Sequence, residues 1–440
     1  MTPAQSIEIQ YSGMDSSLKK FMLEHQLQNS LDRRQAKSTL RSLTLSQSSH
    51  VDFSSNDFLS LAGLPKLKAA FIAEVQTTDT PLGSGGSRLL DGNSEYAERL
   101  EREIAEFHGA EAGLLFNSGF DANAGFFACV PQPGDIIVYD ELIHASVHDG
   151  IRLSRAAKAL SFQHNSLHDL EQVLRRQVQE SQEWKEKKCN VLVAIEAVYS
   201  MDGDIGKLKE ILDMVDAVLG NERGCVIIDE AHSTGVLGPY GAGLVSLLGL
   251  QSRVFARLHT FGKSMAGNGA IILGSHTLRR FLINYARPLI YSTFMSYPSL
   301  ALIRTAYGLL KSGSTSAMQN QLHFLVRSFF RNLCKAQESS GAFRRFLNIP
   351  PGCPESPIFA IRLVEPKSLA HFLQNQGYMV RAVVPPTVPP GAQRIRVCIH
   401  AGNTMAELEG LINALAAWCE AQEGAHGEQE GASRAIQSRL

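Results

Sequence analysis

The sequence predicts an α/β fold, in which helices cover a mostly parallel sheet and a smaller α+β domain follows at the C-terminal end. Two observations predict this arrangement. Apolar runs of strand length alternate with helix-length amphipathic segments from about residue 95 to about residue 275, which is typical of βαβ units. After about residue 300 the pattern changes to longer helices with few strands, which indicates a second domain.

The bulk properties exclude several classes of protein. The chain has 440 residues, of which 44% are hydrophobic and 19% are charged, so it can bury a large core in two domains. A net charge of −1 argues against nucleic acid or an anionic membrane surface as a partner. No apolar run approaches the roughly 18–20 residues that span a bilayer. The seven cysteines are scattered without a Cys-x-x-Cys pair, so we expect reduced thiols in an intracellular compartment and no zinc site.

The elements of the large domain can be predicted in order. Residues 1–60 are expected to form an N-terminal arm with a helix near Leu18–Arg41. A second helix is predicted where apolar residues recur at helical spacing before Gly109, at Tyr96, Leu100, Ile104 and Phe107. Strands within a domain at 61–300 are predicted at Gly113–Phe116, Asp135–Tyr139, Val191–Ala197, Cys225–Asp229, Val254–Thr260 and Ala270–Leu273.

The small domain is expected at 301–422. Its predicted strands lie near Phe359–Leu363 and Arg394–Ile399, and its last helix near Met405–Cys419. A polar run from Arg175 to Lys188 is expected to be a solvated helix face and loop rather than a binding patch. Residues 423–440 are expected to form a flexible tail.

Two residues at strand ends suggest the chemistry. The apolar run from Cys225 ends in Asp229, and Lys263 follows the next predicted strand in a turn of small residues. An aldehyde cofactor needs an amine to hold it as a Schiff base, and a pyridine ring used as an electron sink needs a carboxylate beside its nitrogen. A strand end followed by a turn is where an α/β fold presents such groups. The pair therefore predicts a pyridoxal-phosphate enzyme.

Further residues are candidates for cofactor binding, but each of them can also have a purely structural role. Gly119 and Phe120 follow a strand at a predicted helix start, where backbone N–H groups bind phosphate, although such turns are common. The Thr260 hydroxyl can also reach a phosphate. His144 can stack on a planar ring, and His232 can bond a phenolic oxygen, although a lone histidine in a turn is more often structural.

Two other motifs have more open interpretations. The loop from Gly83 to Arg88 is dense in glycine, but it lacks the spacing of a Walker loop or a dinucleotide site. It still allows a ligand or a partner subunit to come close. Arg394 and Arg396 alternate in a strand pattern and so share one face, where a guanidinium can hold a substrate carboxylate or form a surface ion pair.

Together, these segments resemble those of the α-oxoamine synthases, pyridoxal-phosphate enzymes that condense an amino acid with an acyl-CoA. The resemblance runs from about residue 50 to about residue 420. It implies the aspartate-aminotransferase-like fold of type I enzymes, with a seven-stranded sheet, and a homodimer with shared active sites. The segments that carry it are Phe53–Leu59, the loop at 83–93, Glu196–Asp204, Asp229–Gly235, Thr260–Lys263 and Ile290–Thr293.

The resemblance also implies a role for individual residues. Lys263 would hold the cofactor aldehyde, Asp229 would pair with the pyridine nitrogen, and His144 would stack on the ring. Bonds near the phenolic oxygen are implied for His232 and Ser200. Phosphate contacts are implied for Gly119, Phe120, Thr260 and, across the subunit boundary, Ser292 and Thr293. Substrate contacts are implied for Arg396 at the amino-acid carboxylate, and for Arg41 and Thr387 at the acyl group.

The segment Pro385–Pro389 is most similar to the family member of the biotin pathway. The expected reaction is therefore a decarboxylative condensation of L-alanine with pimeloyl-CoA. Three alternatives stay open: another amino acid and acyl-CoA, an aminotransferase on the same fold, or a non-catalytic scaffold subunit. This chain has Leu59-Ser60-Leu61 where the family usually has Leu-Gly-Leu, and a polar insertion at 178–188, but neither departure touches the predicted catalytic residues.

The two ends of the sequence bear on location. The N-terminal segment lacks the apolar stretch of a secretory signal, and Glu8 and Asp15 do not fit a mitochondrial presequence. Ser438-Arg439-Leu440 is a variant of the Ser-Lys-Leu peroxisomal address, which an import receptor can read on a flexible tail. We therefore expect a peroxisomal protein, with the cytoplasm as the alternative.

Overall fold

The computed structural model describes residues 21–437 except 38, 44, 46–48, 78, 187 and 221, and it describes side chains up to residue 425. The chain divides into two compact units, residues 1–48 and 49–440, which are described separately. Within its described residues the first unit forms helix α1 (Met22–Ala36), inside the range predicted for a helix.

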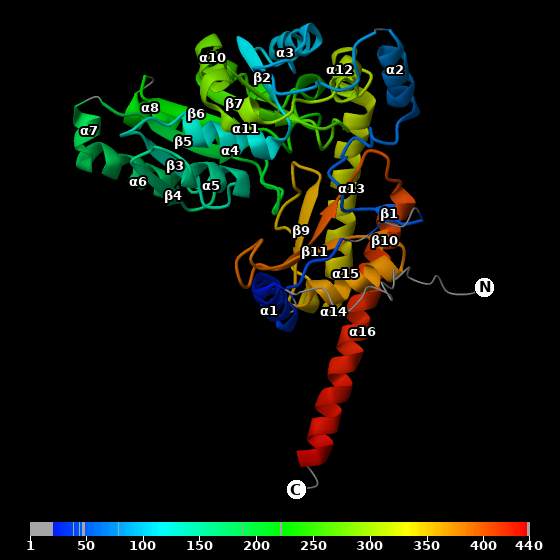
Figure 1. Cartoon of the computed structure of the whole chain (residues 1–440). Helices are drawn as coiled ribbons and strands as arrows, with labels where there is room; N and C mark the ends of the chain where they lie inside the picture. Colours follow the sequence, from blue (N-terminus) through cyan, green and yellow to red (C-terminus); the bar gives the residue numbers. More distant parts are fainter. Residues whose placement is uncertain are drawn as a thin grey trace. The chain divides into compact units, whose positions relative to one another are not determined.

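The second unit is built on a seven-stranded sheet (Figure 1). Its strand order is β2-β8-β7-β6-β5-β3-β4, and the five strands from β7 to β4 are parallel, whereas β8 pairs antiparallel with β7 and β2. The predicted mostly parallel sheet is confirmed. The strands are β2 (Ala112–Phe116), β3 (Ile136–Asp140), β4 (Lys158–Phe162), β5 (Val191–Glu196), β6 (Gly224–Asp229), β7 (Ala256–Thr260) and β8 (Ala270–Gly274).

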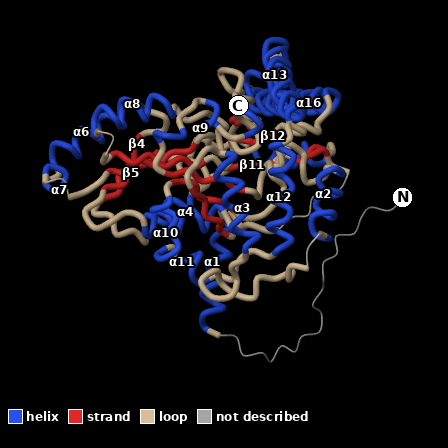
Figure 2. The backbone as a smooth tube through the Cα atoms, turned by 90° about the horizontal axis from the view of Figure 1, so that it is seen from above, coloured by secondary structure: helices blue, strands red, loops and turns tan. Residues whose placement is uncertain are grey.

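Helices cover both faces of this sheet. Along β5, Val191 and Val193 belong to one apolar cluster and Leu192 to another, so successive side chains enter opposite cores. Figure 2 shows the red strands between two sets of blue helices. Each buried aliphatic side chain contributes about 1.5–3 kcal/mol. One core receives side chains from α3 (Glu95–Phe107), α6 (Leu167–Glu180) and α8 (Leu208–Leu219), and the other from α4 (Gly119–Cys129), α5 (Ala145–Arg152) and α10 (His276–Tyr285).

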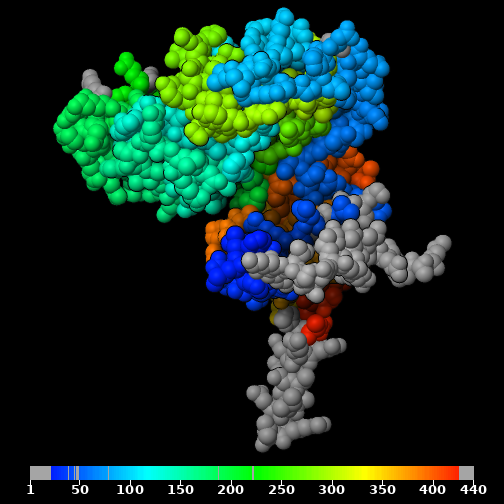
Figure 3. All heavy atoms as spheres, in the orientation of Figure 1, coloured from blue at the N-terminus to red at the C-terminus, as the bar shows by residue number. Residues whose placement is uncertain are grey.

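Two small sheets form the C-terminal part of this unit. One is antiparallel, with the order β11-β12-β9, and the other pairs β1 with β10 in parallel. Figure 3 shows the orange surface of this part against the green surface of the large-sheet part. The small strands are β1 (Val51–Asp52), β9 (Ile358–Arg362), β10 (Tyr378–Met379), β11 (Arg381–Val383) and β12 (Arg394–Cys398). The remaining helices are α2 (Pro65–Gln76), α7 (Gln182–Lys185), α9 (Leu244–Leu247), α11 (Arg287–Tyr291), α12 (Tyr297–Lys311), α13 (Ser316–Ser339), α14 (Gly341–Phe346), α15 (Pro366–Asn375) and α16 (Met405–Gln437).

The segment after β1 is tied to the small sheets. The backbone N–H of Cys398 donates to the carbonyl of Phe53 at 2.8 Å, and β1 itself pairs with β10. Ser60, which stands where the α-oxoamine synthases usually have glycine, has a φ of 56°. Its hydroxyl accepts a hydrogen bond from Gly402 N at 3.0 Å, which helps to hold this left-handed backbone.

Two segments differ from what their composition suggests. Helix α16 continues through Gln437, where the sequence predicts a flexible tail from residue 423, because alanine, glutamate and glutamine favour a helix. The polar run contains the short helix α7, whose Trp184 is buried under the Arg223 guanidinium, 3.5 Å from the ring centroid. Within the described ranges, no helix is long and apolar enough to cross a membrane, and no His, Cys, Asp and Glu group is arranged to hold a metal ion.

Candidate active site

The predicted catalytic residues gather at the carboxyl edge of the parallel strands. Asp229 is the last residue of β6, and Glu196, the last residue of β5, is its partner in the sheet register. Lys263 lies three residues after the end of β7, and His144 lies four residues after the end of β3. Because parallel strands end at the same edge, residues far apart in sequence converge here.

Asp229 is held through both of its oxygens. Its Oδ2 accepts from Asn123 Nδ2 at 2.8 Å, and its Oδ1 accepts from Ala231 N at 2.9 Å. The Asp229 side chain is buried. Hydrogen bonds to both oxygens fix the direction of the carboxylate.

A polar chain joins Asp229 to His144. Asn123 Nδ2 donates to Ser146 Oγ at 3.0 Å as well as to Asp229, and Ser146 Oγ lies 2.7 Å from His144 Nδ1. Burial lowers the pKa of His144, and the Lys263 ammonium lowers it further, whereas Asp229 opposes the shift. The imidazole is therefore neutral near pH 7 and can present its face to a planar ring.

Lys263 lies in the turn that follows β7. Ala266 N donates to the Lys263 carbonyl at 2.9 Å, and Ala266 has a φ of 52°, so the turn is tight. Burial lowers the pKa of the Lys263 amine, and the carboxylates of Asp229 and Glu196 offset part of that shift. A lowered pKa provides the unprotonated amine that attack on an aldehyde needs.

His232 and Glu196 each have one buried polar atom without a partner among the described residues, namely His232 Nδ1 and Glu196 Oε1. Burial lowers the pKa of His232 well below its ordinary value, and the nearby Lys263 adds to the shift. Burial and Asp229 raise the pKa of Glu196 well above its ordinary value. A buried unpaired polar atom costs about 1–3 kcal/mol, so a polar ligand placed here would stabilise the site. The residues fit pyridoxal phosphate in this respect.

Gly119 and Thr260, which are both predicted to hold the cofactor phosphate, lie close together. Gly119 is the first residue of α4, and a Cβ on it would lie only 3.3 Å from Thr260 Oγ1. Thr260 donates its hydroxyl to Gly269 O at 3.2 Å. The Phe120 ring is 45% exposed and stands edge-on to His144, with 6.4 Å between centroids. The absence of a side chain at Gly119 keeps the helix N-terminus open to an anion.

The two strand arginines differ in their partners. Arg394 forms an ion pair with Asp202. Arg396 instead donates to neutral oxygens, from Nε to Ser200 O at 2.7 Å and from Nη2 to Asn56 Oδ1 at 2.8 Å. Its charge lowers the pKa of both Lys263 and His232, which places it beside the cluster. Because no carboxylate neutralises it within the described chain, Arg396 is the arginine suited to a substrate carboxylate.

Four predicted residues are not brought into this cluster by contacts within the chain. Thr293 is exposed, and its carbonyl accepts from Asn117 Nδ2 at 2.8 Å, two residues before Gly119. Ser292 is half-buried at the end of α11. Thr387 is exposed in the loop between β11 and β12. Arg41 belongs to the first unit, which is described separately.

The site also contains residues that the sequence did not single out, namely Asn56, Asn123, Ser146 and Glu196. The contact of Asn123 with Asp229 joins residues 106 positions apart, so no local pattern could reveal it. Glu196 did carry a signal, because an acidic residue at the end of an apolar run predicts a buried ionisable group.

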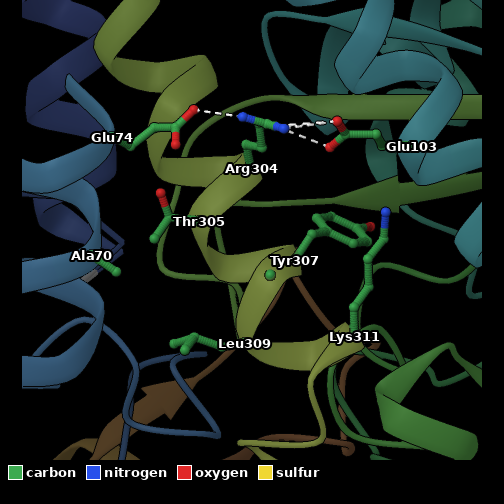
Figure 4. A pocket seen from close by; sticks show the side chains of 9 residues that line it. Ala70, Glu74, Glu103, Arg304, Thr305, Tyr307, Leu309 and Lys311 are labelled. Carbon is green, nitrogen blue, oxygen red and sulfur yellow. Dashed lines mark hydrogen bonds and ion pairs between the residues drawn. The ribbon is translucent and has the colours of Figure 1, made fainter. Parts of the chain in front are cut away.

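One pocket of the second unit is not lined by these residues. The pocket of about 350 Å³ in Figure 4 lies between α2, α3 and α12, and none of the predicted site residues lines it. Arg304 spans its wall between Glu74 and Glu103, at 2.8 and 3.0 Å. The Arg304 guanidinium is therefore already paired with two carboxylates and is not free to bind a ligand.

Comparison with known proteins identifies the family. Residues 48–415 match the family described as aminotransferase class I and II. The chain is 49% identical to an 8-amino-7-oxononanoate synthase of Emericella nidulans, over 91% of this chain and 97% of the relative. It is 39% identical to the aminoacyl transferase sphA of Aspergillus fumigatus, over 88% and 86% of the two chains.

A solved structure of serine palmitoyltransferase from S. paucimobilis superimposes with a TM-score of 0.76, covering 91% of this chain and 99% of that one at 23% identity. That likeness shows the fold. Membership of the family is shown by the match of the family model and by the relatives at 49% and 39% identity. The chain therefore belongs to the aminotransferase class I and II family and, within it, to the α-oxoamine synthases, which are pyridoxal-phosphate-dependent enzymes.

Proposed function

We propose that this protein is an 8-amino-7-oxononanoate synthase, which condenses L-alanine with pimeloyl-CoA and releases CoA and CO₂. The observation that carries this proposal is the placement of a half-buried lysine, Lys263, beside Asp229 and beside an arginine, Arg396, that no carboxylate in the described chain neutralises. That set suits an α-amino acid with a free carboxylate. The choice of L-alanine and pimeloyl-CoA is supported by the relative of that name at 49% identity.

Pyridoxal phosphate, when bound, supplies an electron sink for negative charge at the amino-acid Cα. Asp229 would hold the pyridine nitrogen protonated, because Asn123 and Ala231 fix its carboxylate in place. The neutral His144 would lie against the ring, and His232 Nδ1 is available for the phenolic oxygen. Gly119 and Thr260 would hold the phosphate.

The chain's own groups also handle the proton and the carboxylate. Arg396 would bind the carboxylate of L-alanine and orient its Cα. Lys263 Nζ, with its pKa lowered by burial, would take the Cα proton and return one after CO₂ has left. The new carbon–carbon bond joins the alanine Cα to the pimeloyl carbonyl, the thioester C–S bond breaks, and the CoA thiolate takes a proton from solvent to depart as the thiol. The bond between Cα and the carboxylate then breaks and releases CO₂.

The proposal is tested by measuring CoA-thiol release from purified, cofactor-loaded protein. L-alanine and glycine are each offered with pimeloyl-, succinyl-, acetyl- and palmitoyl-CoA. We expect release with L-alanine and pimeloyl-CoA and none from the Lys263→Ala variant. Release with other pairs alone would reject the proposed substrates, and turnover by Lys263→Ala would reject the role of this lysine.

The specific alternative is a sister activity with another amino acid or acyl-CoA. It is favoured by the 39% identity to an aminoacyl transferase. The same cofactor, lysine and arginine would serve it, so only the substrate panel separates the two. Glycine turnover without L-alanine turnover would favour it.

We also propose a homodimer in which Ser292 and Thr293 complete the phosphate site of the partner subunit. Within one chain Thr293 is exposed although its backbone lies beside Asn117, near Gly119. The glycine loop at 83–86 and the exposed Phe120 offer a surface that a second copy can cover. Light scattering should give twice the mass of 48.1 kDa, and a monomer with full cofactor affinity would contradict the proposal.

Import into peroxisomes is proposed from Ser438-Arg439-Leu440, which lie outside the described residues. Pimeloyl-CoA is a medium-chain acyl-CoA of the kind that peroxisomal β-oxidation produces, which suits this location. A fluorescent protein fused before the native C-terminus should enter peroxisomes, and Leu440→Asp should leave it in the cytoplasm. The same distribution for both fusions would contradict the proposal.

A further inference from the structure

His164 lies between two loops that both carry predicted site residues. Its Nδ1 is 2.9 Å from Asp140 Oδ1, and its Nε2 is 2.8 Å from Asp204 Oδ2. Asp140 ends β3, four residues before His144, and Asp204 lies four residues after Ser200. One imidazole thus bridges the loop after β3 and the loop after β5.

The neighbouring Asn165 strengthens the same bridge. Its backbone N–H donates to Asp140 Oδ2 at 2.9 Å, and its Nδ2 donates to Asp204 Oδ2 at 2.5 Å. It also donates to Ile205 O at 3.2 Å, and its φ of 51° allows these bonds together. Asp140 Oδ1 in turn accepts from Leu142 N at 2.9 Å, so the carboxylate shapes the loop that leads to His144.

The environment of His164 makes it a cation. Burial alone would lower the pKa of the imidazole, but hydrogen bonds to Asp140 and Asp204 outweigh burial and raise the pKa to about 10. Both ring nitrogens therefore donate at neutral pH, and each carboxylate accepts a charge-assisted hydrogen bond. The buried Tyr199 ring stands edge-on at 4.5 Å and keeps the imidazole in one orientation.

The segment from Tyr199 to Asp204, which we name the junction loop, is also held from the other side. Asp202 pairs with Arg394 and with Arg362, the latter at 3.0 Å. Ser356 Oγ donates to Gly203 O at 2.6 Å. The junction loop thus lies between the large sheet, through His164, and the small antiparallel sheet, through two arginines.

Ser200, inside the junction loop, connects this framework to the substrate site. Its carbonyl accepts from Arg396 Nε at 2.7 Å, which is one of the two contacts that fix the guanidinium. A cavity of about 610 Å³ borders the loop, and His164, Asp202 and Asp204 line it. Because solvent space lies beside the loop, its position depends on these anchoring contacts.

We propose that His164 is a positioning residue, which fixes the junction loop against the end of β3 and so places Ser200 and Arg396 around the amino-acid carboxylate. The inference rests on the proposed function only in assigning an amino-acid carboxylate to Arg396. His164 itself touches neither cofactor nor substrate in this scheme. Its effect is transmitted through Asp204 and the junction loop.

Two amide variants separate the two arms of the bridge. The amide nitrogen of asparagine reaches the position of Nδ1, so His164→Asn keeps the bond to Asp140 and loses the one to Asp204. The amide of glutamine reaches the position of Nε2, so His164→Gln keeps the bond to Asp204. The measured quantity is the dissociation constant for L-alanine, taken from the absorbance change of the bound cofactor without any acyl-CoA.

We expect His164→Asn to raise this constant about tenfold, the size of one lost charge-assisted hydrogen bond, and His164→Gln to raise it less than about threefold. Arg304→Gln is the matched control, because Arg304 also bridges two carboxylates, in the pocket of Figure 4, away from the site. It should lower the thermal midpoint without changing L-alanine binding.

Equal dissociation constants for wild type, His164→Asn and Arg304→Gln would overturn the proposal, as would equal losses in the two His164 variants. Glycine and L-serine are titrated in parallel. If one of them is the natural substrate, its dissociation constant should rise in His164→Asn and change less in His164→Gln. If the variants show these differences in amino-acid binding but the wild-type protein releases no CoA, the proposed function is rejected and the role of His164 stands.

Discussion

Asn123→Ala tests the polar chain that holds Asp229. The Asn123 side chain is only 4% exposed, and its Nδ2 donates to Asp229 at 2.8 Å and to Ser146 at 3.0 Å. Loss of the bond to the charged carboxylate costs about 1.5–3 kcal/mol, and loss of the bond to the hydroxyl about 0.5–1.5 kcal/mol. We expect the free energy of unfolding to fall by about 2–4 kcal/mol, and the affinity for pyridoxal phosphate to fall about tenfold or more because Asp229 is no longer held in place.

The assay combines urea unfolding of the cofactor-free protein with a fluorescence titration of pyridoxal phosphate. Asn284→Ala is the matched control, because the exposed Asn284 donates its Nδ2 to Arg280 O at 2.7 Å on the surface of α10. Its free energy of unfolding should change by less than about 0.5 kcal/mol. The reasoning is refuted if Asn123→Ala matches this control in both measurements.

Three further predictions concern Arg396, His108 and Gly203. Arg396→Lys keeps the charge but loses the planar fork, so KM for the amino acid should rise about tenfold or more with a smaller change in kcat, and equal falls in kcat and kcat/KM would contradict this. Burial lowers the pKa of His108 to about 3, whereas the same side chain in the unfolded chain takes up its proton below about pH 6.5. The free energy of unfolding should therefore fall as the pH drops from 6.5 to 3. His108→Gln should flatten that slope by up to about 1.4 kcal/mol per pH unit. Gly203→Ala should lower the thermal midpoint, because its Cβ would lie 2.3 Å from Ile358 O at a φ of 76°, whereas Gly308→Ala, with nothing within 4 Å, should raise it or leave it unchanged.

The strands that the sequence predicted are those buried on both faces. The apolar run of β6 ends in Asp229, and the structure places the strand end at that residue. Strand β4 was missed because only Phe162 of its five residues is fully buried, so it has no apolar run, whereas β2 at the other sheet edge is buried throughout. Strand β11 was missed for its length of three residues.

The residues of the candidate site also fall into those that the sequence predicted and those that it could not predict. Lys263, Asp229 and His232 were predicted because each lies at or just after a strand end with a local signature. Asn123 could not be predicted in its role, because its hydrogen bond with Asp229 depends on how α4 packs against the sheet. His164 likewise gains its function from two carboxylates that lie 24 and 40 residues away.

The most direct test of the proposed function is the fate of the L-alanine carboxylate. The purified enzyme is supplied with pimeloyl-CoA and L-alanine labelled with ¹³C in the carboxyl group, and labelled CO₂ and CoA thiol are measured together. A decarboxylative condensation predicts one labelled CO₂ for each CoA thiol released, and a product without the label whose mass is that of 8-amino-7-oxononanoate. Thiol release without labelled CO₂, or a product that keeps the label, would contradict the proposed function.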